Sequence, residues 1–417
     1  ATFLRDKERA IREYLGLLLE RADANSVREA LSVVVRSRSL TLIDEVLSAK
    51  GEALGKRERK RLDDLRRRLA ATASDPPGTR SAVVATSPSL LRAWAETVSA
   101  LALGTGKGVR RAQASAAVIV ETARGAFALI EGAAAPLGDA QTDWARELDW
   151  LSFDLLAPTV DTQASAQACI ESLAGFAERI SPAAGARSVS PSGAFWRVPW
   201  QAFALLRGNP EPVVLHSPVF DGKAGERRLP RRPRVVIWAG RADDLPGVER
   251  EVDALLSVYP RARVLRTLAA VQQCLTGSEF DLLHVVGHAT VNAENPMFSR
   301  IEFPDGPLFA VEVAGSELRV GAVVLAACDT GRAPLWSLSE PDGLARAFLA
   351  CGARWAIASQ WALDDTAGVL LTSTLHRELK RGSPVGEALR SARIKTRADR
   401  DHPYYWAPMF LLGGYAT

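Results

Sequence analysis

The spacing of apolar residues divides the chain into a helical beginning and a longer part in which strands and helices alternate. Near the start, apolar residues recur at helical spacing at Leu4, Ile11, Tyr14, Leu15 and Leu18. Residues 26–49 predict a helical hairpin, and residues 56–70 predict a charged helix with a narrow stripe of leucines. A helical pair cannot bury its second face by itself, so this beginning either packs on the rest of the chain or ends a stack of helical repeats.

Short apolar runs after residue 82 predict strands. The run at 115–132 bends at a glycine and indicates a hairpin, and a second hairpin is expected to turn at Asp305 and Gly306. Buried strands are predicted at 234–240, 280–288, 321–331 and 353–361, with a last strand at 405–414. Helical patterns separate most of them; one such helix buries a face made of Val248, Val252, Leu255 and Tyr259. This alternation predicts an α/β fold with a mostly parallel sheet and helices on both faces.

Two stretches rich in proline and charge are the predicted boundaries, at residues 74–81 and 225–234. They divide the chain into a helical segment (1–73), a mixed part (82–226) and a regular α/β part (230–417). With 417 residues, of which 47% are hydrophobic, the chain is long enough for two or three domains.

Charge and hydropathy exclude several classes of function. The net charge of +4 is small for this length, and the basic run at 56–70 is typical of a solvated helix face, so we expect no direct contact with nucleic acid. No segment approaches about 18 unbroken apolar residues and the N-terminal segment is charged, so we expect a cytoplasmic protein without a membrane span. The glycine-rich residues 103–109 lack the spacing of a phosphate-binding loop and are interpreted as a turn.

The four cysteines lie far apart and form no C-x-x-C pair, which argues against a disulfide framework and against structural zinc. We expect neither a metal nor a cofactor. Cys169, Cys274 and Cys351 fit core positions, and His284, inside a predicted strand, fits a structural histidine.

Two other residues carry candidate chemistry. His288 ends the strand predicted at 280–288, and Cys328 ends the strand predicted within 321–331. Because the carboxyl ends of parallel strands meet at one edge of a sheet, these side chains can face each other there. A cysteine nucleophile beside a histidine is typical of peptide-bond hydrolysis, in which backbone N–H groups stabilise the oxyanion; those of Ala289 and Cys328 are our candidates.

At these residues the sequence resembles a known family. "LLHVVGHAT", "VVLAACDTG", "DGLARAFLACGARWAIASQWALDD" and "HPYYWAPMFLLGG" resemble the CHAT family, caspase-like cysteine peptidases often fused to tetratricopeptide repeats. The resemblance is continuous over about residues 230–417, and "WRVPWQAFALL" and "SVVVRSRSLTLIDEVLS" extend it upstream. It implies a caspase/separase-type fold in which a degenerate half (82–226) packs beside a catalytic half (230–417), after a segment that ends a repeat array.

The resemblance also implies roles for single residues. His288 takes the position of the family's catalytic histidine and Cys328 that of its nucleophile. The chain departs from the family at Ala289, where glycine is usual, and at Asp329, where glutamate is usual. Neither change removes a reacting group, so we expect an active enzyme.

Residues 359–365, "SQWALDD", lie in the family's substrate-lining stretch, so Gln360, Trp361, Asp364 and Asp365 are expected to bind substrate. By analogy with separases, Asp365, ahead of Asp364, would select Arg or Lys at P1. An Asp pair directly before a helix is also what helix capping favours; we prefer capping for Asp364, and for Asp365 both capping and substrate binding stay open. Trp406 is expected to lie in the core.

The leading hypothesis is a cysteine endopeptidase that cleaves a particular protein partner and is regulated by a protein or effector bound through its helical N-terminal part. The resemblance implies a setting in bacterial immunity or regulated cell death, for example the activation of a gasdermin-like pore former. The alternative is a catalytically silent CHAT scaffold that binds proteins.

Overall fold

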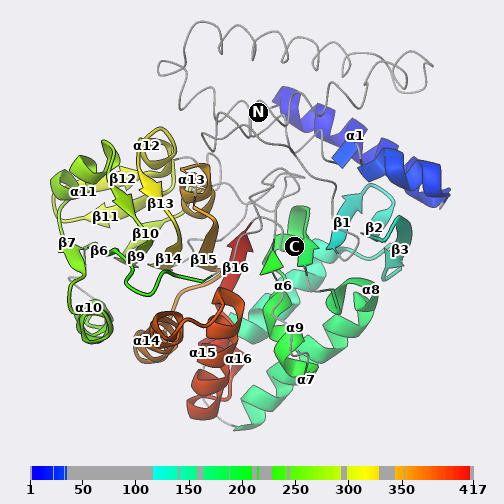
Figure 1. Ribbon diagram of the computed structural model, residues 1–417. Helices are drawn as coiled ribbons and strands as arrows, with labels where there is room; N and C mark the ends of the chain where they lie inside the picture. Colours follow the sequence, from blue (N-terminus) through cyan, green and yellow to red (C-terminus); the bar gives the residue numbers. More distant parts are fainter. Residues whose placement is uncertain are drawn as a thin grey trace, which may run out of the picture.

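In the computed structural model, helices flank one large sheet (Figure 1). The structure describes residues 2–21, 23–31, 33–34, 116–139, 141–156, 163–186, 188–208, 214–215, 228–241, 245–292, 298–327, 343–351 and 353–413. The strands of the large sheet are β1 (Ala116–Thr122), β2 (Gly125–Ile130), β3 (Ala133–Leu137), β4 (Ser188–Ser190), β5 (Val214–Leu215), β6 (Val235–Ala239), β7 (Arg263–Leu265), β9 (Leu282–Gly287), β14 (Val323–Ala327), β15 (Trp355–Ser359) and β16 (Met409–Gly413). Their order is β3-β2-β1-β4-β5-β16-β15-β14-β9-β6-β7.

Most neighbouring strands are parallel; the antiparallel pairs of this sheet in the described residues are β1–β2, β2–β3 and β15–β16. The expected α/β fold with a mostly parallel sheet is therefore confirmed. Two small sheets accompany the large one. One contains β10 (Ala289–Thr290), β11 (Arg300–Phe303) and β12 (Gly306–Phe309), and the other pairs β8 (Glu279–Phe280) with β13 (Arg319–Val320).

The helices are α1 (Thr2–Glu20), α6 (Trp144–Leu156), α7 (Gln163–Arg179), α8 (Ser181–Ala184), the 3-10 turn η1 (Gly193–Arg197), α9 (Trp200–Leu206), α10 (Gly247–Val258), α11 (Leu268–Leu275), α12 (Ala310–Ala314), α13 (Leu344–Ala350), α14 (Asp365–Arg381), α15 (Val385–Asp399) and α16 (Pro403–Trp406). Residues 24–31 are helical as well.

Strand β9 shows why helices cover both faces of the sheet. Its residues are all buried, and successive side chains point to opposite faces. Leu283 and Val285 share a core with residues of α11, α12 and α13, while Leu282 packs in the core formed with α14 and α15. A strand buried on both faces reads as a continuous apolar run, which is the pattern that predicted it.

The helical beginning packs on the first strands. Leu15 and Leu19 of α1 share a core with Val118 and Val120 of β1, and Arg124 binds Glu20 at 2.7 Å. Of the two alternatives for this segment, packing on the rest of the chain holds for its described part. The expected helices between residues 35 and 70 and the predicted boundary at 74–81 lie outside the described residues.

The two predicted halves share the large sheet. Strand β16 lies between β5 of the first half and β15 of the second, and Leu412 pairs with Leu215. Arg393 of α15 also hydrogen-bonds the Gln201 side chain of α9 and the backbone oxygen of Met409. The sheet therefore continues across the predicted boundary at 225–234.

Both expected hairpins are present, with one correction. β1 and β2 pair antiparallel across the turn before Gly125, as predicted. In the second hairpin Phe303 pairs with Gly306, so the turn is made by Pro304 and Asp305, one residue earlier than predicted. The Asp305 carboxylate accepts the N–H groups of Leu268 and Ala269 at the start of α11, which holds it in the loop.

Among the described residues, no helix combines the length and the apolar character needed to cross a bilayer.

Candidate active site

The strands that precede His288 and Cys328 are direct neighbours. β9 and β14 pair parallel from Val323↔Leu283 to Ala327↔Gly287. His288 and Cys328 each follow one partner of that last pair. Cys328 itself lies outside the described residues, so the structure gives the ends of the two strands but no distance between the two side chains.

Gly287 allows the chain to leave β9 beside another strand. Its φ is +131°, a conformation that L side chains rarely adopt. A Cβ at this position would lie 2.9 Å from Cα of Gly240, which follows β6. Glycine at position 287 therefore lets two chain segments approach closely, directly before His288.

The backbone after His288 is held by a small sheet. The His288 oxygen accepts the Glu302 N–H at 2.9 Å, and its N–H donates to Arg241. His288 and Glu302 form a hydrogen-bonded pair of this antiparallel ladder, so the next pair, Ala289 and Ile301, is a non-hydrogen-bonded one. The Ala289 N–H therefore points away from β11. This orientation is compatible with the oxyanion role predicted for that N–H.

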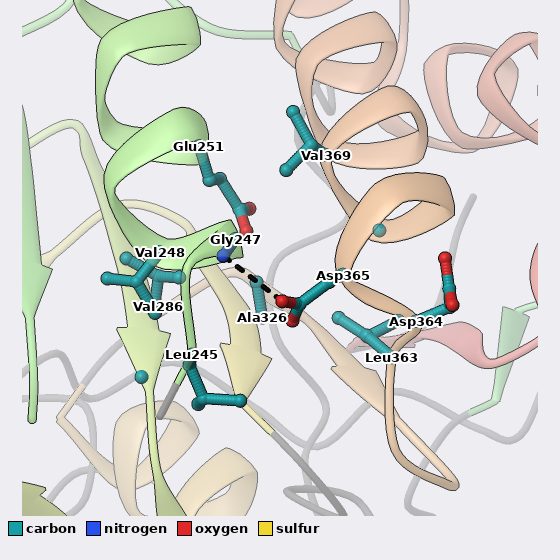
Figure 2. A pocket seen from close by; sticks show the side chains of 12 residues that line it. Leu245, Gly247, Val248, Glu251, Val286, Ala326, Leu363, Asp364, Asp365 and Val369 are labelled. Carbon is teal, nitrogen blue, oxygen red and sulfur yellow. Dashed lines mark hydrogen bonds between the residues drawn. The ribbon is translucent and has the colours of Figure 1, made fainter. Parts of the chain in front are cut away.

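A pocket opens on one side of these strand ends, between the first turns of α10 and α14 (Figure 2). It holds about 370 Å³ of empty space, its open mouth included. The floor contains Gly287 and Ala326, which come one and two residues before His288 and Cys328. Val286 of β9 also lines the pocket, and the other lining residues come from the α10 and α14 sides: Leu245, Gly247, Val248, Glu251, Leu363, Asp364, Asp365, Gly368 and Val369.

Asp364 and Asp365 both line this pocket but differ in their contacts. Asp364 caps α14, because its Oδ1 accepts the N–H groups of Thr366 at 3.0 Å and Ala367 at 2.8 Å. The preference for capping at this position is confirmed. Asp365 turns towards α10, where Gly247 donates its N–H at 3.2 Å, whereas the Asp364 carboxylate points away from α10 (Figure 2).

Gln360 and Trp361 face other parts of the protein. Gln360 Nε2 donates to the backbone oxygens of Trp196 at 2.7 Å and Val198 at 3.2 Å. Trp361 is buried, and its indole N–H donates to the Tyr404 oxygen at 3.0 Å. Neither is among the residues that line the pocket. Trp406 is fully buried, as expected.

Beneath the pocket lies a buried polar chain that the sequence did not reveal. His284 Nδ1 lies 3.0 Å from His376 Nε2 of α14, and His284 Nε2 lies 3.0 Å from Glu251 Oε1, off the axis of an ideal hydrogen bond. Burial and the neighbouring His284 hold the pKa of His376 well below its usual value. The structural role expected for His284 is thus confirmed. An available signal was Glu251 itself, an acid one turn from Val248 and Leu255 on the apolar helix face.

The three cysteines in the described residues lie in buried or half-buried positions. Cys169 and Cys274 are buried, and burial, with a smaller effect of Asp154, raises the pKa of Cys169 to about 12. Cys351 is half-buried and donates its S–H to the Val313 oxygen at 2.8 Å. Within the described ranges, no group of three or more His, Cys, Asp or Glu side chains is arranged to hold a metal ion.

Comparison with solved structures finds distant likenesses to cysteine peptidases and to a separase complex. A chain of the Saccharomyces cerevisiae separase–securin complex matches with 13% identity and a TM-score of 0.41, over 54% of this chain and 15% of that one. The Arg-specific cysteine proteinase gingipain R (RgpB) matches with 12% identity and a TM-score of 0.39, over 65% of this chain and 74% of that one. A complex of Porphyromonas gingivalis RgpB pro- and mature domains matches with 11% identity and a TM-score of 0.38, over 66% of this chain and 76% of that one. Our chain thus spans only a small part of the matched chain in the separase complex.

No curated protein matches the sequence. The family model of the CHAT domain does, over residues 177–414. The match begins in α7 and includes β4, β5, β16 and every strand from β6 to β15, together with the positions of His288 and Cys328. Because this match covers more than half of the sequence, the chain belongs to the CHAT-domain family.

Proposed function

We propose that this protein is a cysteine endopeptidase in which Cys328 is the nucleophile and His288 the general acid and base. The observation that carries the proposal is the register of β9 and β14. Gly287 and Ala327 are paired residues, so the next residue of each strand, His288 and Cys328, leaves the sheet at the same edge. A histidine that follows one strand end and a cysteine that follows the neighbouring one supply a base and a thiol.

The reaction follows from these two groups. The Cys328 thiol passes its proton to His288, and the thiolate attacks the carbonyl carbon of the scissile peptide bond. The oxyanion that forms accepts hydrogen bonds from the backbone N–H groups of Ala289 and Cys328. When the C–N bond breaks, the leaving nitrogen takes the proton from His288, and water then hydrolyses the thioester and returns a proton to the sulfur.

The pocket beside Gly287 is the proposed site for the P1 side chain. Apolar walls and carboxylates line it, which favours a side chain with an aliphatic stem and a cationic end, Arg or Lys. Asp365 contributes to this preference from α14. Gln360 and Trp361 are proposed to hold the segment that leads to Asp365, through their bonds to neighbouring backbone oxygens.

The biological setting is proposed from family membership. We propose a cytoplasmic peptidase that cleaves one particular protein partner in bacterial immunity or regulated cell death, with a gasdermin-like pore former as the example. A regulatory protein or effector is proposed to bind the helical N-terminal part. Helix α1 of this part packs on β1 and β2, which belong to the same sheet as β9 and β14.

Covalent labelling tests the dyad. The protein is treated with a peptidyl acyloxymethyl ketone carrying Arg at P1, and the modified residue is mapped by mass spectrometry. We expect an adduct on Cys328 that His288→Ala abolishes. Cys169 and Cys274 serve as internal controls, because buried thiols, and in Cys169 a raised pKa, should leave them unmodified.

P1 preference is tested separately with reporter peptides. Cleavage after Arg but not after Asp or Leu is expected, and equal cleavage of all three would remove the proposed selectivity. A folded protein that gives no adduct at Cys328 and cleaves no reporter would instead support the alternative, a silent CHAT scaffold that binds proteins.

A further inference from the structure

A buried carboxylate lines the inner part of the pocket. The Glu251 side chain of α10 is 6% exposed, whereas the Asp365 side chain at the start of α14 is 37% exposed. Figure 2 shows Glu251 reaching from α10 into the space between α10 and α14. A carboxylate removed from water in this way needs a donor or a cation to compensate its charge.

The three carboxylates described at the pocket differ in what their oxygens already bind. Asp364 accepts two backbone N–H groups of α14, and Asp365 accepts the Gly247 N–H and lies 3.9 Å from Arg250. In the described part of the chain, no backbone N–H is found to donate to Glu251, and His284 Nε2 lies 3.0 Å from its Oε1. The two aspartate carboxylates are therefore partly stabilised by backbone N–H groups at helix starts, whereas the Glu251 carboxylate is not.

Two buried histidines lie beneath Glu251. The low pKa of His376 keeps its ring neutral at neutral pH. His376 Nε2 and His284 Nδ1 lie 3.0 Å apart, which leaves Nε2 as the ring nitrogen of His284 that faces Glu251. His284 Nε2 lies 3.0 Å from Glu251 Oε1 but off the axis of an ideal hydrogen bond, so the Glu251 carboxylate can accept a hydrogen bond from a ligand.

The walls between the mouth and Glu251 suit the rest of such a ligand. Leu245, Val248, Val286, Leu363 and Val369 provide apolar contact for an aliphatic stem. We propose that Glu251 receives the cationic end of a basic substrate side chain and is the main determinant of P1 specificity, with Asp365 secondary at the mouth. This inference rests on the proposed peptidase function, whose failure the following experiment recognises.

Two readouts test the role of Glu251. The first is binding of agmatine, a guanidinium on an aliphatic stem, to the full chain by calorimetry. The second is the ratio of labelling rates for acyloxymethyl ketones with Arg or its neutral isostere citrulline at P1. We expect Glu251→Gln to weaken agmatine binding at least tenfold and to bring the Arg-to-citrulline ratio close to one. The matched control is Glu249→Gln on the same helix, where Glu249 binds Arg266 away from the pocket; it should leave both values unchanged.

The outcomes separate the two proposals. If no ketone labels Cys328 but agmatine binds in a Glu251-dependent way, the peptidase function fails and the binding site stands. If labelling proceeds with the same Arg preference in Glu251→Gln as in the wild type, the role of Glu251 is refuted and the peptidase stands. Wild-type protein that binds no agmatine and shows no preference for Arg also refutes it.

A second variant covers the case in which Glu251→Gln does not fold. Gly368→Ala adds a methyl group to the pocket wall on α14, where the new Cβ would lie 3.3 Å from Leu363 Cβ. Alanine favours a helix, so this variant should fold. It should weaken agmatine binding by narrowing the pocket, and unchanged binding would place agmatine elsewhere and overturn the inference.

Discussion

Gly287 and Gly240 approach each other so closely that a Cβ on Gly287 would lie 2.9 Å from the Gly240 Cα. Gly287 also has a φ of +131°. We expect Gly287→Ala to lower the free energy of unfolding by about 1–3 kcal/mol, since backbone strain and the collision add together. Labelling of Cys328 should slow as well, because His288 is the next residue.

Urea unfolding measures the first effect, and Gly175→Ala on α7 is the control. A Cβ at Gly175 meets nothing within 4 Å, so this variant should be neutral or more stable. Equal stability of Gly287→Ala and wild type would contradict the close approach of β9 to Gly240.

The lowered pKa of His376 makes the free energy of unfolding depend on pH. Its pKa is lowered by burial and by His284 in the folded protein, so the unfolded chain binds the proton first as the pH falls. The free energy of unfolding should therefore fall below about pH 6.5, with a slope of up to about 1.4 kcal/mol per pH unit from this group. Urea titrations between pH 5.5 and 7.5 check this, and His376→Gln should lose that part of the slope. A variant that keeps the wild-type slope would assign it to another group.

Asp364 separates capping from charge. Asparagine caps a helix about as well as aspartate, so Asp364→Asn should change the free energy of unfolding by less than about 0.5 kcal/mol, while Asp364→Ala should cost about 0.5–2 kcal/mol. Both should still prefer Arg over citrulline at P1. If Asp364→Asn is as unstable as Asp364→Ala, the negative charge, and not the cap, is what the helix needs.

Gln360 is predicted to act on stability and not on substrate choice. Gln360→Met removes the donor to the Trp196 and Val198 oxygens and should cost about 1–3 kcal/mol. The ratio of Arg to Leu cleavage should stay the same. Gln167→Met, at an exposed residue that bonds Glu171, is the control and should cost less than about 0.5 kcal/mol. A changed cleavage ratio in Gln360→Met would instead support the substrate contact expected for Gln360 from the sequence.

The strand ends were predictable from the sequence because buried parallel strands form apolar runs, and each run here stops at a candidate residue. The register was not. Gly287 and Ala327 belong to different strands, and only the folded sheet shows that they pair. Residues 360–365 show a different limit, since neighbours in one predicted substrate segment face different partners: Gln360 the first half, Trp361 the core, Asp364 its own helix and Asp365 the pocket.

Glu251, His284 and His376 lie on three elements, and His284 and His376 are 92 positions apart. Each fits a local pattern of its own, an apolar helix face or a buried strand, and nothing local links one to another. Long-range polar contacts of this kind depend on how helices dock on the sheet, which hydrophobic periodicity leaves open.

Because β16 lies at the centre of the large sheet, we expect the two halves of that sheet to join only after residues 409–413 have been synthesised. Residues 409–413 separate β5 from β15, so both halves of the sheet end at an unpaired edge until this segment has left the ribosome. Until then each nascent half exposes a strand edge to neighbouring chains, which is a hazard for aggregation. Insertion of β16 would pair both of these edges in one step and join the half that carries α1 to the half that carries His288.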